Sequence, residues 1–210
     1  MGLLETKNLR QRLNRPISFK SGTDGVLKLS RYRTGVALAQ ENRHEEALEE
    51  FKIALEKDPK APRAHYNMGQ TYAALGQHAE AIDCYERALG IDPKFVEAQN
   101  NIGVAYINLQ RGNDAIKHFH RALRIAPKYY EALLNLGIIY YQLGNFFNSI
   151  KAFKKVLAVE ATDKIAIYHL GLVYAEWKDI EAARKQAAIL SKLDPEMAAD
   201  LTRQIVLRAY

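Results

Sequence analysis

Glycine recurs every 34 residues along most of this chain, and this regularity constrains the fold more than any other feature. The five copies are Gly35, Gly69, Gly103, Gly137 and Gly171. Self-similarity at this period is typical of stacked structural repeats, in which each unit packs only against its neighbours. With the glycine numbered as position 8, the repeats span residues 28–61, 62–95, 96–129, 130–163 and 164–195.

Three further positions of the repeat keep their chemical type. Position 20 is small in every copy: Ala47, Ala81, Ala115, Ser149 and Ala183. Position 24 is aromatic in four copies: Phe51, Tyr85, Phe119 and Phe153. Position 32 is proline in four copies, and proline ends a helix because it has no N–H and disfavours helix in the residue before it. The pattern therefore predicts helical hairpins, each with small residues where its two helices approach closely.

This pattern resembles the tetratricopeptide repeat family over residues 28–195. The resemblance implies an all-α fold, a right-handed α-solenoid of five helix-turn-helix units. Gly76 and Gly144 are expected at the turns between paired helices. Repeat five departs from the pattern, since Ala187 replaces the aromatic residue. Residues 196–210 contain Met197, Leu201 and Ile205 on one helical face, which predicts a C-terminal capping helix.

The excess positive charge lies at the N-terminal end of the chain. Residues 1–35 contain eight basic and two acidic residues, whereas the remainder contains 22 of each. The balanced remainder argues against a nucleic-acid-binding surface. Residues 1–27 are predicted to be a basic arm, with a short amphipathic helix before Pro16 and a turn at 21–25. Three interpretations of the arm stay open: a solvated tail, a weak membrane-surface contact through residues 1–15, and a cap on repeat one.

The first helix of each repeat has a second face, opposite its core positions. Successive residues are about 100° apart, so positions 2, 6, 9 and 13 lie opposite positions 4, 8 and 11. Position 6 is asparagine in three consecutive copies, Asn67, Asn101 and Asn135, and His169 in the fifth. An amide donates and accepts together, as the N–H and C=O groups of an extended peptide require. We predict that this face binds a partner's backbone.

Amides alone would bind weakly, because each hydrogen bond nets about 0.5–1.5 kcal/mol against an association cost of about 4–15 kcal/mol. Position 9 adds apolar surface and one further amide: Gln70, Val104, Ile138 and Leu172. Tyr66, at position 5, can contact the same ligand or pack against the next repeat. The arrangement resembles the asparagine ladder of the O-linked N-acetylglucosamine transferase family. That resemblance implies an extended partner segment in a concave groove; this chain has no transferase domain.

Other binding and catalytic sites find no support. The carboxylate clamp of heat-shock co-chaperones needs basic groove residues, but position 2 includes Glu97 and Glu131. A chaperone-tail partner is therefore not expected. The chain has no HExxH, Cys/His cluster, P-loop or GxSxG motif, so we expect no metal, cofactor or catalytic residue. The lone cysteine, Cys84, fits a reducing compartment and is expected to be a partly buried, unreactive thiol.

Together these features predict a non-enzymatic, cytoplasmic scaffold that binds an extended segment of a protein partner. Two alternatives stay open. The chain could assemble with copies of itself through its terminal repeats and arm, or it could be a regulatory subunit of an enzyme complex.

Overall fold

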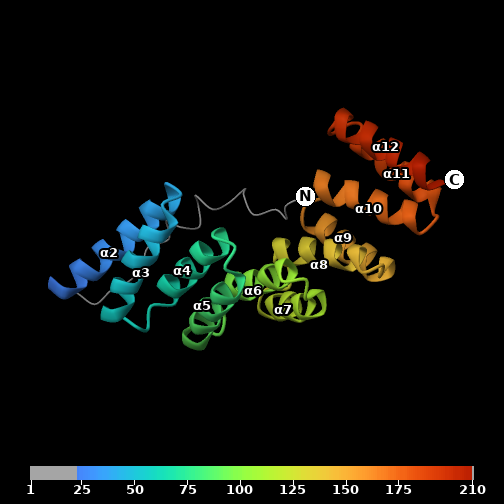
Figure 1. Cartoon of the computed structure of the whole chain (residues 1–210). Helices are drawn as coiled ribbons and strands as arrows, with labels where there is room; N and C mark the ends of the chain where they lie inside the picture. Colours follow the sequence, from blue (N-terminus) through green and yellow to red (C-terminus); the bar gives the residue numbers. More distant parts are fainter. Residues whose placement is uncertain (1–22, 210) are drawn as a thin grey trace. The chain divides into compact units, whose positions relative to one another are not determined.

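A computed structural model of the chain describes residues 23–209, with side chains from residue 30 onward (Figure 1). The described residues form eleven α-helices and no strand. The helices are α2 (Thr23–Gln40), α3 (His44–Lys57), α4 (Pro62–Ala74), α5 (His78–Ile91), α6 (Val96–Asn108), α7 (Gly112–Ile125), α8 (Tyr130–Gln142), α9 (Phe146–Val159), α10 (Lys164–Glu176), α11 (Ile180–Leu190) and α12 (Pro195–Ala209). The predicted all-α fold is confirmed.

The chain divides into two compact units, one ending at His118 and the other beginning at Phe119. The first unit contains the hairpins α2–α3 and α4–α5, followed by α6 and the first half of α7. The second contains the rest of α7, the hairpins α8–α9 and α10–α11, and α12. Each unit is described by itself below.

The chain reverses at the same point in every repeat, through one residue in the left-handed conformation. This residue, at position 15, has a φ between 59° and 74° in all five copies: Asn42, Gly76, Gln110, Gly144 and Lys178. The next residue closes the turn on the helix before it, as when the Gln77 N–H donates to the Tyr72 carbonyl at 2.9 Å. The turns predicted at Gly76 and Gly144 are confirmed.

Glycine at position 8 gives room for the aromatic ring at position 24 of the same repeat. A Cβ placed on Gly69 would lie 2.7 Å from Cε1 of Tyr85 and 3.1 Å from the Ala81 carbonyl oxygen. A Cβ on Gly137 would lie 2.5 Å from Cε1 of Phe153. These separations are shorter than a real contact between carbon atoms, so the predicted close approach of the two helices depends on glycine.

We predict that Gly69→Ala lowers the free energy of unfolding by about 1–2 kcal/mol, because the added methyl group overpacks the contact with buried Tyr85. Gly90→Ala, in α5 of the same repeat, is the matched control, since its Cβ would meet nothing within 4 Å. There the better helix propensity of alanine should give a gain of up to about 1 kcal/mol. Urea titration followed by circular dichroism measures both changes; equal effects at the two sites would contradict the role of Gly69.

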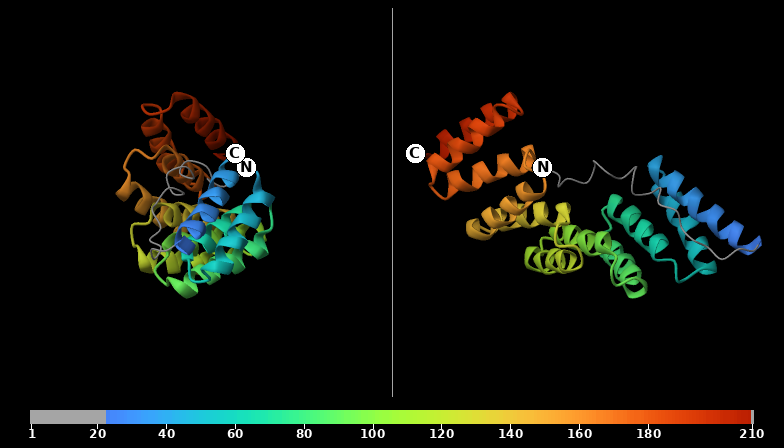
Figure 2. Two further views of the ribbon diagram at one scale, coloured as in Figure 1. Left: turned by 90° about the vertical axis from the view of Figure 1, so that its left-hand side faces the viewer. Right: turned by 180° about the vertical axis from the view of Figure 1, so that it is seen from behind.

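The last helix, α12, substitutes for the aromatic residue that repeat five lacks. It packs along α10 and α11 within the second unit (Figures 1 and 2). A Cβ placed on Gly171 would lie 2.7 Å from Cδ2 of Leu201, which is fully buried. Leu201 therefore takes the place that Phe51, Tyr85 and Phe153 take in other repeats. With Ile205 also buried, α12 covers repeat five as a capping helix is expected to do.

We predict that Leu201→Ala destabilises the second unit by about 2–5 kcal/mol, because it leaves a cavity against Gly171. Leu207→Ala on the same helix removes a side chain that is 73% exposed and should change stability by at most about 0.5 kcal/mol. Thermal unfolding compares the two variants. A small effect of both would show that α12 does not stabilise the unit.

The N-terminal end of the first helix differs from the expectation. The turn predicted at 21–25 is wrong for residues 23–25, because α2 already begins at Thr23, five residues before the first repeat in the sequence register. Threonine and aspartate are residue types favoured near the start of a helix, and the sequence has them at 23 and 24. The rest of the arm, including the proposed membrane contact through residues 1–15, lies outside the described residues.

Candidate binding surface

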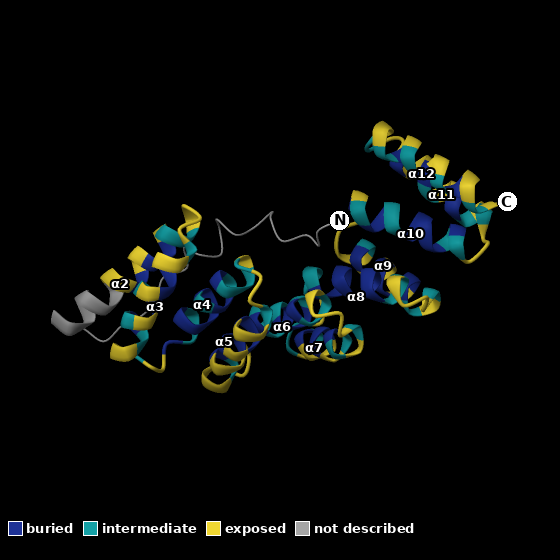
Figure 3. Cartoon of the chain, viewed as in Figure 1, coloured by how far each residue is buried: buried dark blue, intermediate teal, exposed yellow. Residues whose placement is uncertain are grey.

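The candidate ligand residues all lie on the first helices of their repeats, and we call them the ladder surface. In the first unit they are Tyr66, Asn67 and Gln70 on α4, and Asn101 and Val104 on α6. In the second unit they are Asn135 and Ile138 on α8, and His169 and Leu172 on α10. Four of the nine keep intermediate exposure, namely Gln70, Asn101, Val104 and His169, and the other five are buried (Figure 3).

In the first unit, asparagines at position 6 bind tyrosines of the preceding repeat. Nδ2 of Asn67 donates to the hydroxyl of Tyr32 at 2.7 Å, and Nδ2 of Asn101 donates to the hydroxyl of Tyr66 at 3.1 Å. In both pairs the tyrosine is at position 5 and the asparagine follows it by 35 residues. The pairing is therefore a contact between successive repeats.

This pairing corrects the expectation that position 6 lies on a face that does not pack. Asn67 is only 4% exposed and Asn135 only 7%. Asn67 is covered because the tyrosine ring of the preceding repeat reaches its amide. Asn101 is the exception: it keeps intermediate exposure, and its Oδ1 accepts from Nδ2 of Asn100 at 3.2 Å.

The two tyrosines of these pairs, Tyr32 and Tyr66, are buried packing residues. Burial raises the pKa of Tyr32, although the nearby cation of Arg63 and the hydrogen bond from Asn67 act in the opposite direction. Tyr66 is buried, with its ring 4.7 Å from that of Phe95 and 5.6 Å from that of Tyr85. Its hydroxyl accepts from Asn101, and it shares a buried cluster with Ala98 and Ile102, so of the two roles expected for Tyr66 its geometry favours packing against the next repeat.

In the second unit the same pairing recurs with a carboxylate. The hydroxyl of Tyr168 donates to Oδ2 of Asp200 on α12 at 2.5 Å. Burial first, and then the charge and hydrogen bond of Asp200, raise the pKa of Tyr168 to about 12. Pro62 is the first residue of α4 and Pro195 the first residue of α12. When the two sequences are aligned at these prolines, Asp200 corresponds to Asn67. Helix α12 therefore takes the place of the first helix of a sixth repeat. It begins three residues earlier in the chain than the 34-residue period predicts.

His169 is held by aromatic rings. Its imidazole stacks on Phe153, with centroids 5.6 Å apart and planes 7° apart, and meets the edge of Tyr168. Burial lowers its pKa, while Asp163 acts in the opposite direction. His169 is therefore a neutral, partly exposed ring at neutral pH.

The sequence of the repeats is similar to that of a known family. Family models described as tetratricopeptide repeat or TPR repeat match residues 35–76, 62–95, 95–159 and 134–198. Together these matches run without a gap from residue 35 to residue 198.

The chain belongs to the tetratricopeptide repeat family.

Solved tetratricopeptide proteins share this fold. YrrB, described as a TPR protein with an unusual peptide-binding site, has a TM-score of 0.69 at 23% identity, covering 82% of this chain and 90% of its own. TTC0263, a thermophilic TPR protein of Thermus thermophilus, has a TM-score of 0.61 at 24% identity over 86% and 98%. MamA residues 41 to the end from Desulfovibrio magneticus RS-1 has 0.75 at 19% identity over 84% and 98%. No curated protein sequence matches the chain.

Three of the six histidines lie within hydrogen-bonding distance of other groups of the repeats. His65 lies 2.9 Å from the Pro59 carbonyl, His118 lies 3.1 Å from Oε1 of Gln99, and His120 lies 3.0 Å from the hydroxyl of Tyr140. In residues 23–209 no three His, Cys, Asp or Glu side chains gather as a metal would require. Over the same residues, every helix is too short or too polar to cross a membrane.

We predict that Cys84 reacts slowly with thiol reagents in the folded protein. The thiol is buried, and burial raises its pKa to about 11, so roughly 0.1% is thiolate at pH 8. The rate of labelling by iodoacetamide should be low at pH 8, rise steeply with pH, and rise again at pH 8 when urea unfolds the chain. Fast labelling of the folded protein at pH 8 would contradict this environment.

Proposed function

We propose that this tetratricopeptide protein is a non-enzymatic scaffold that binds an extended segment of a partner protein along the ladder surface. Repeats of this family are in general interaction modules, and YrrB, which shares the fold, is described as having a peptide-binding site. A cytoplasmic location, consistent with a single cysteine, belongs to the same proposal.

The tyrosine–asparagine pairing is the observation that carries this proposal. The bond from Asn101 to Tyr66 fixes the amide in one orientation before any ligand arrives. A peptide binding to this amide then loses less side-chain entropy than one binding to a mobile asparagine. Since Asn101 is also the most accessible of the three asparagines, we assign it the central contact with the partner's backbone.

Residues beside Asn101 complete the contact in the first unit. Val104, one turn further along α6, adds partly exposed apolar surface. Gln70 on α4 adds an amide whose Oε1 is buried and has no hydrogen-bond partner among the described residues. A buried acceptor without a partner costs free energy, and because the side chain as a whole is partly exposed, a rotation of it would present this oxygen to a donor on the ligand. Asn67 acts in this proposal as support beneath the contact, because Tyr32 covers it.

The second unit contributes a more apolar contact. Ile138 and Leu172 are nearly buried, with 9% and 8% of their surface exposed. His169 adds a neutral, partly exposed imidazole ring. Asn135, like Asn67, is buried and has the supporting role. We therefore propose that the second unit binds apolar side chains of a partner, whereas the first unit binds backbone groups.

The charged residues at position 2 determine whether the C-terminus of a partner protein can bind here. Glu97 and Glu131 repel a C-terminal carboxylate, and the one basic residue there, Arg63, lies with its guanidinium 5.4 Å from the centre of the Phe95 ring. A chaperone tail with a terminal carboxylate is not the partner that we propose. An internal segment of a protein, with no charged terminus, fits better.

The test uses peptides selected on the wild-type protein from a random-sequence library displayed on phage. Asn101→Ala combined with Gln70→Ala should weaken the selected peptide by about 5- to 100-fold in calorimetric Kd, since two hydrogen-bonding groups are lost. Methylating the backbone nitrogens of the peptide should weaken it similarly, because the contact is with the backbone.

Two controls separate contact from folding. Asn113→Ala removes an exposed asparagine that is outside the ladder surface and should leave Kd unchanged. Tyr66→Phe removes the acceptor for Asn101 and keeps the amide, so its effect should be smaller than that of Asn101→Ala. Unchanged affinity in the double variant, with unfolding also unchanged, would overturn the proposed contact.

Self-assembly is the alternative that one observation favours. Val206 and Leu207 are 50% and 73% exposed on α12, the helix that stands as the start of a sixth repeat. Light scattering over a range of concentrations decides between the two functions: a rise in mass with concentration, abolished by Leu207→Asp, would favour assembly over the scaffold.

A further inference from the structure

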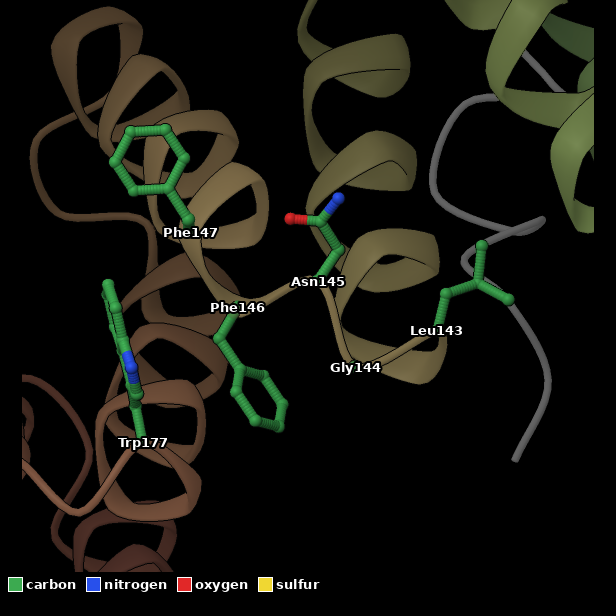
Figure 4. Close-up of a pocket in the computed structure, with 6 residues that line it drawn as sticks. All are labelled: Leu143, Gly144, Asn145, Phe146, Phe147 and Trp177. Atoms are coloured by element: carbon green, nitrogen blue, oxygen red, sulfur yellow. The ribbon is translucent and has the colours of Figure 1, made fainter.

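The turns of repeats four and five carry a cluster of aromatic and aliphatic side chains, three of them exposed and one half-buried, which we call the tip patch. It consists of Leu143, Phe146, Phe147 and Trp177, all in the second unit (Figure 4). Leu143 and Trp177 are 50% exposed and Phe147 is 58% exposed. With Gly144 and Asn145 they surround a shallow depression of about 450 Å³. Large apolar side chains rarely gather in the open without a partner.

The other repeats show that the fold does not require these side chains. At position 18, where repeat four has Phe147, the other copies have Glu45, Ala79, Asn113 and Glu181. At position 17, where it has Phe146, the first three have His44, His78 and Gly112. Trp177 replaces a leucine of repeats two to four. The turns of the other repeats form without an aromatic residue at position 18, so the fold does not require Phe147, whereas Phe146 is half-buried and packs against Tyr141.

The tip patch is held rigidly. Oδ1 of Asn145 accepts from the Asn148 N–H at 3.3 Å and caps α9, beside Phe146 and Phe147. Oδ1 of Asp179 accepts from the Ala182 N–H at 3.0 Å and caps α11, two residues after Trp177. Both caps fix the turns, so the aromatic side chains project from a preformed frame.

Lysines continue the patch along α9. Nζ of Lys151 lies 4.9 Å from the centre of the Phe147 ring, and Lys154 follows on the same side of the helix. Lys151, Lys154 and Lys155 are exposed, and no carboxylate pairs with any of them among the described residues. From residue 119 to residue 159 the sequence has six lysines and arginines and one acidic residue, Glu131. Because residues 36–210 as a whole contain equal numbers of basic and acidic residues, this local excess of positive charge does not appear in their net charge.

We propose that the tip patch and the lysines of α9 form a contact surface for an anionic lipid bilayer. Tryptophan and phenylalanine favour the boundary between headgroups and acyl chains. Lysines beside them are attracted to anionic headgroups, which adds the second signal that stable attachment of a peripheral protein needs. The protein would lie on the bilayer surface, since none of the helices described could cross it.

Two features favour a bilayer over an acidic protein segment. The depression is shallow and open, whereas a protein anchor needs a pocket that excludes water. The cations are all lysines on this helix, and lysine is depleted in protein interfaces while it suits diffuse attraction to a charged surface.

Trp177 makes the test specific, because it is the only tryptophan of the chain. Its fluorescence is recorded with vesicles of phosphatidylcholine alone and with vesicles that also contain phosphatidylglycerol. With the anionic vesicles, emission should shift to shorter wavelength and acrylamide should quench it less; with phosphatidylcholine alone it should stay unchanged. Raising the salt concentration should reverse the shift, because lysine attraction is screened.

Substitutions separate the contribution of the lysines of α9 from that of the tip patch. Lys151→Ala with Lys154→Ala should lower the partition coefficient roughly 20- to 30-fold, about fivefold for each charge. Lys57→Ala with Lys60→Ala, two exposed lysines of the first unit, is the control with equal charge change and should have little effect. Phe147→Asn introduces the residue that repeat three has at this position and should lower partitioning several-fold without loss of stability.

Two outcomes would overturn the proposal. Vesicles that sediment with the protein and leave Trp177 emission unchanged would place the contact elsewhere in the chain. An acidic peptide, such as polyglutamate, that shifts Trp177 emission when anionic vesicles do not would identify a protein partner in place of the bilayer.

Discussion

The contact between the glycine at position 8 and the aromatic ring at position 24 is the constraint on which the rest of the structure depends. It brings the two helices of a hairpin so close that a Cβ at position 8 would overlap the ring, as at Gly69 and Tyr85. Because the ring is then buried, each hairpin presents a fixed outline to its neighbours. Where the ring is absent, in repeat five, a leucine from α12 restores the same contact.

A second contact joins successive repeats and also prepares the candidate binding surface. The tyrosine at position 5 reaches the amide at position 6 of the following repeat, in Tyr32–Asn67 and Tyr66–Asn101. The amides thus have a role in packing as well as the role proposed for ligand binding. Position 5 is Asn100 and Leu134 in repeats three and four, which lack the tyrosine; at the end of the repeats Tyr168 makes a similar bond to the carboxylate of Asp200.

Much of the fold could be predicted from the sequence because its signals are local and recur five times. The helices, the turns at Gly76 and Gly144 and the close approach at position 8 each depend on residues within one repeat. The burial of Asn67 could not be read from helical geometry alone, since it depends on how one repeat meets the next. The sequence does contain the pattern that accompanies this burial, because an asparagine follows a tyrosine by 35 residues in the first repeats. The excess of positive charge on α9 does not appear in the net charge of the repeats, because acidic residues of the first repeats balance it.

The left-handed residue at position 15 gives the hairpins unequal local stability. Glycine adopts this conformation without steric cost in repeats two and four, but Asn42, Gln110 and Lys178 adopt it in the others. A residue with a Cβ pays about 1–2 kcal/mol there, and asparagine less than the rest. Repeats one, three and five therefore hold a small internal strain that their neighbours lack. Fluctuations that open a turn should follow this alternation, so that the chain loosens in every second hairpin before it unfolds as a whole.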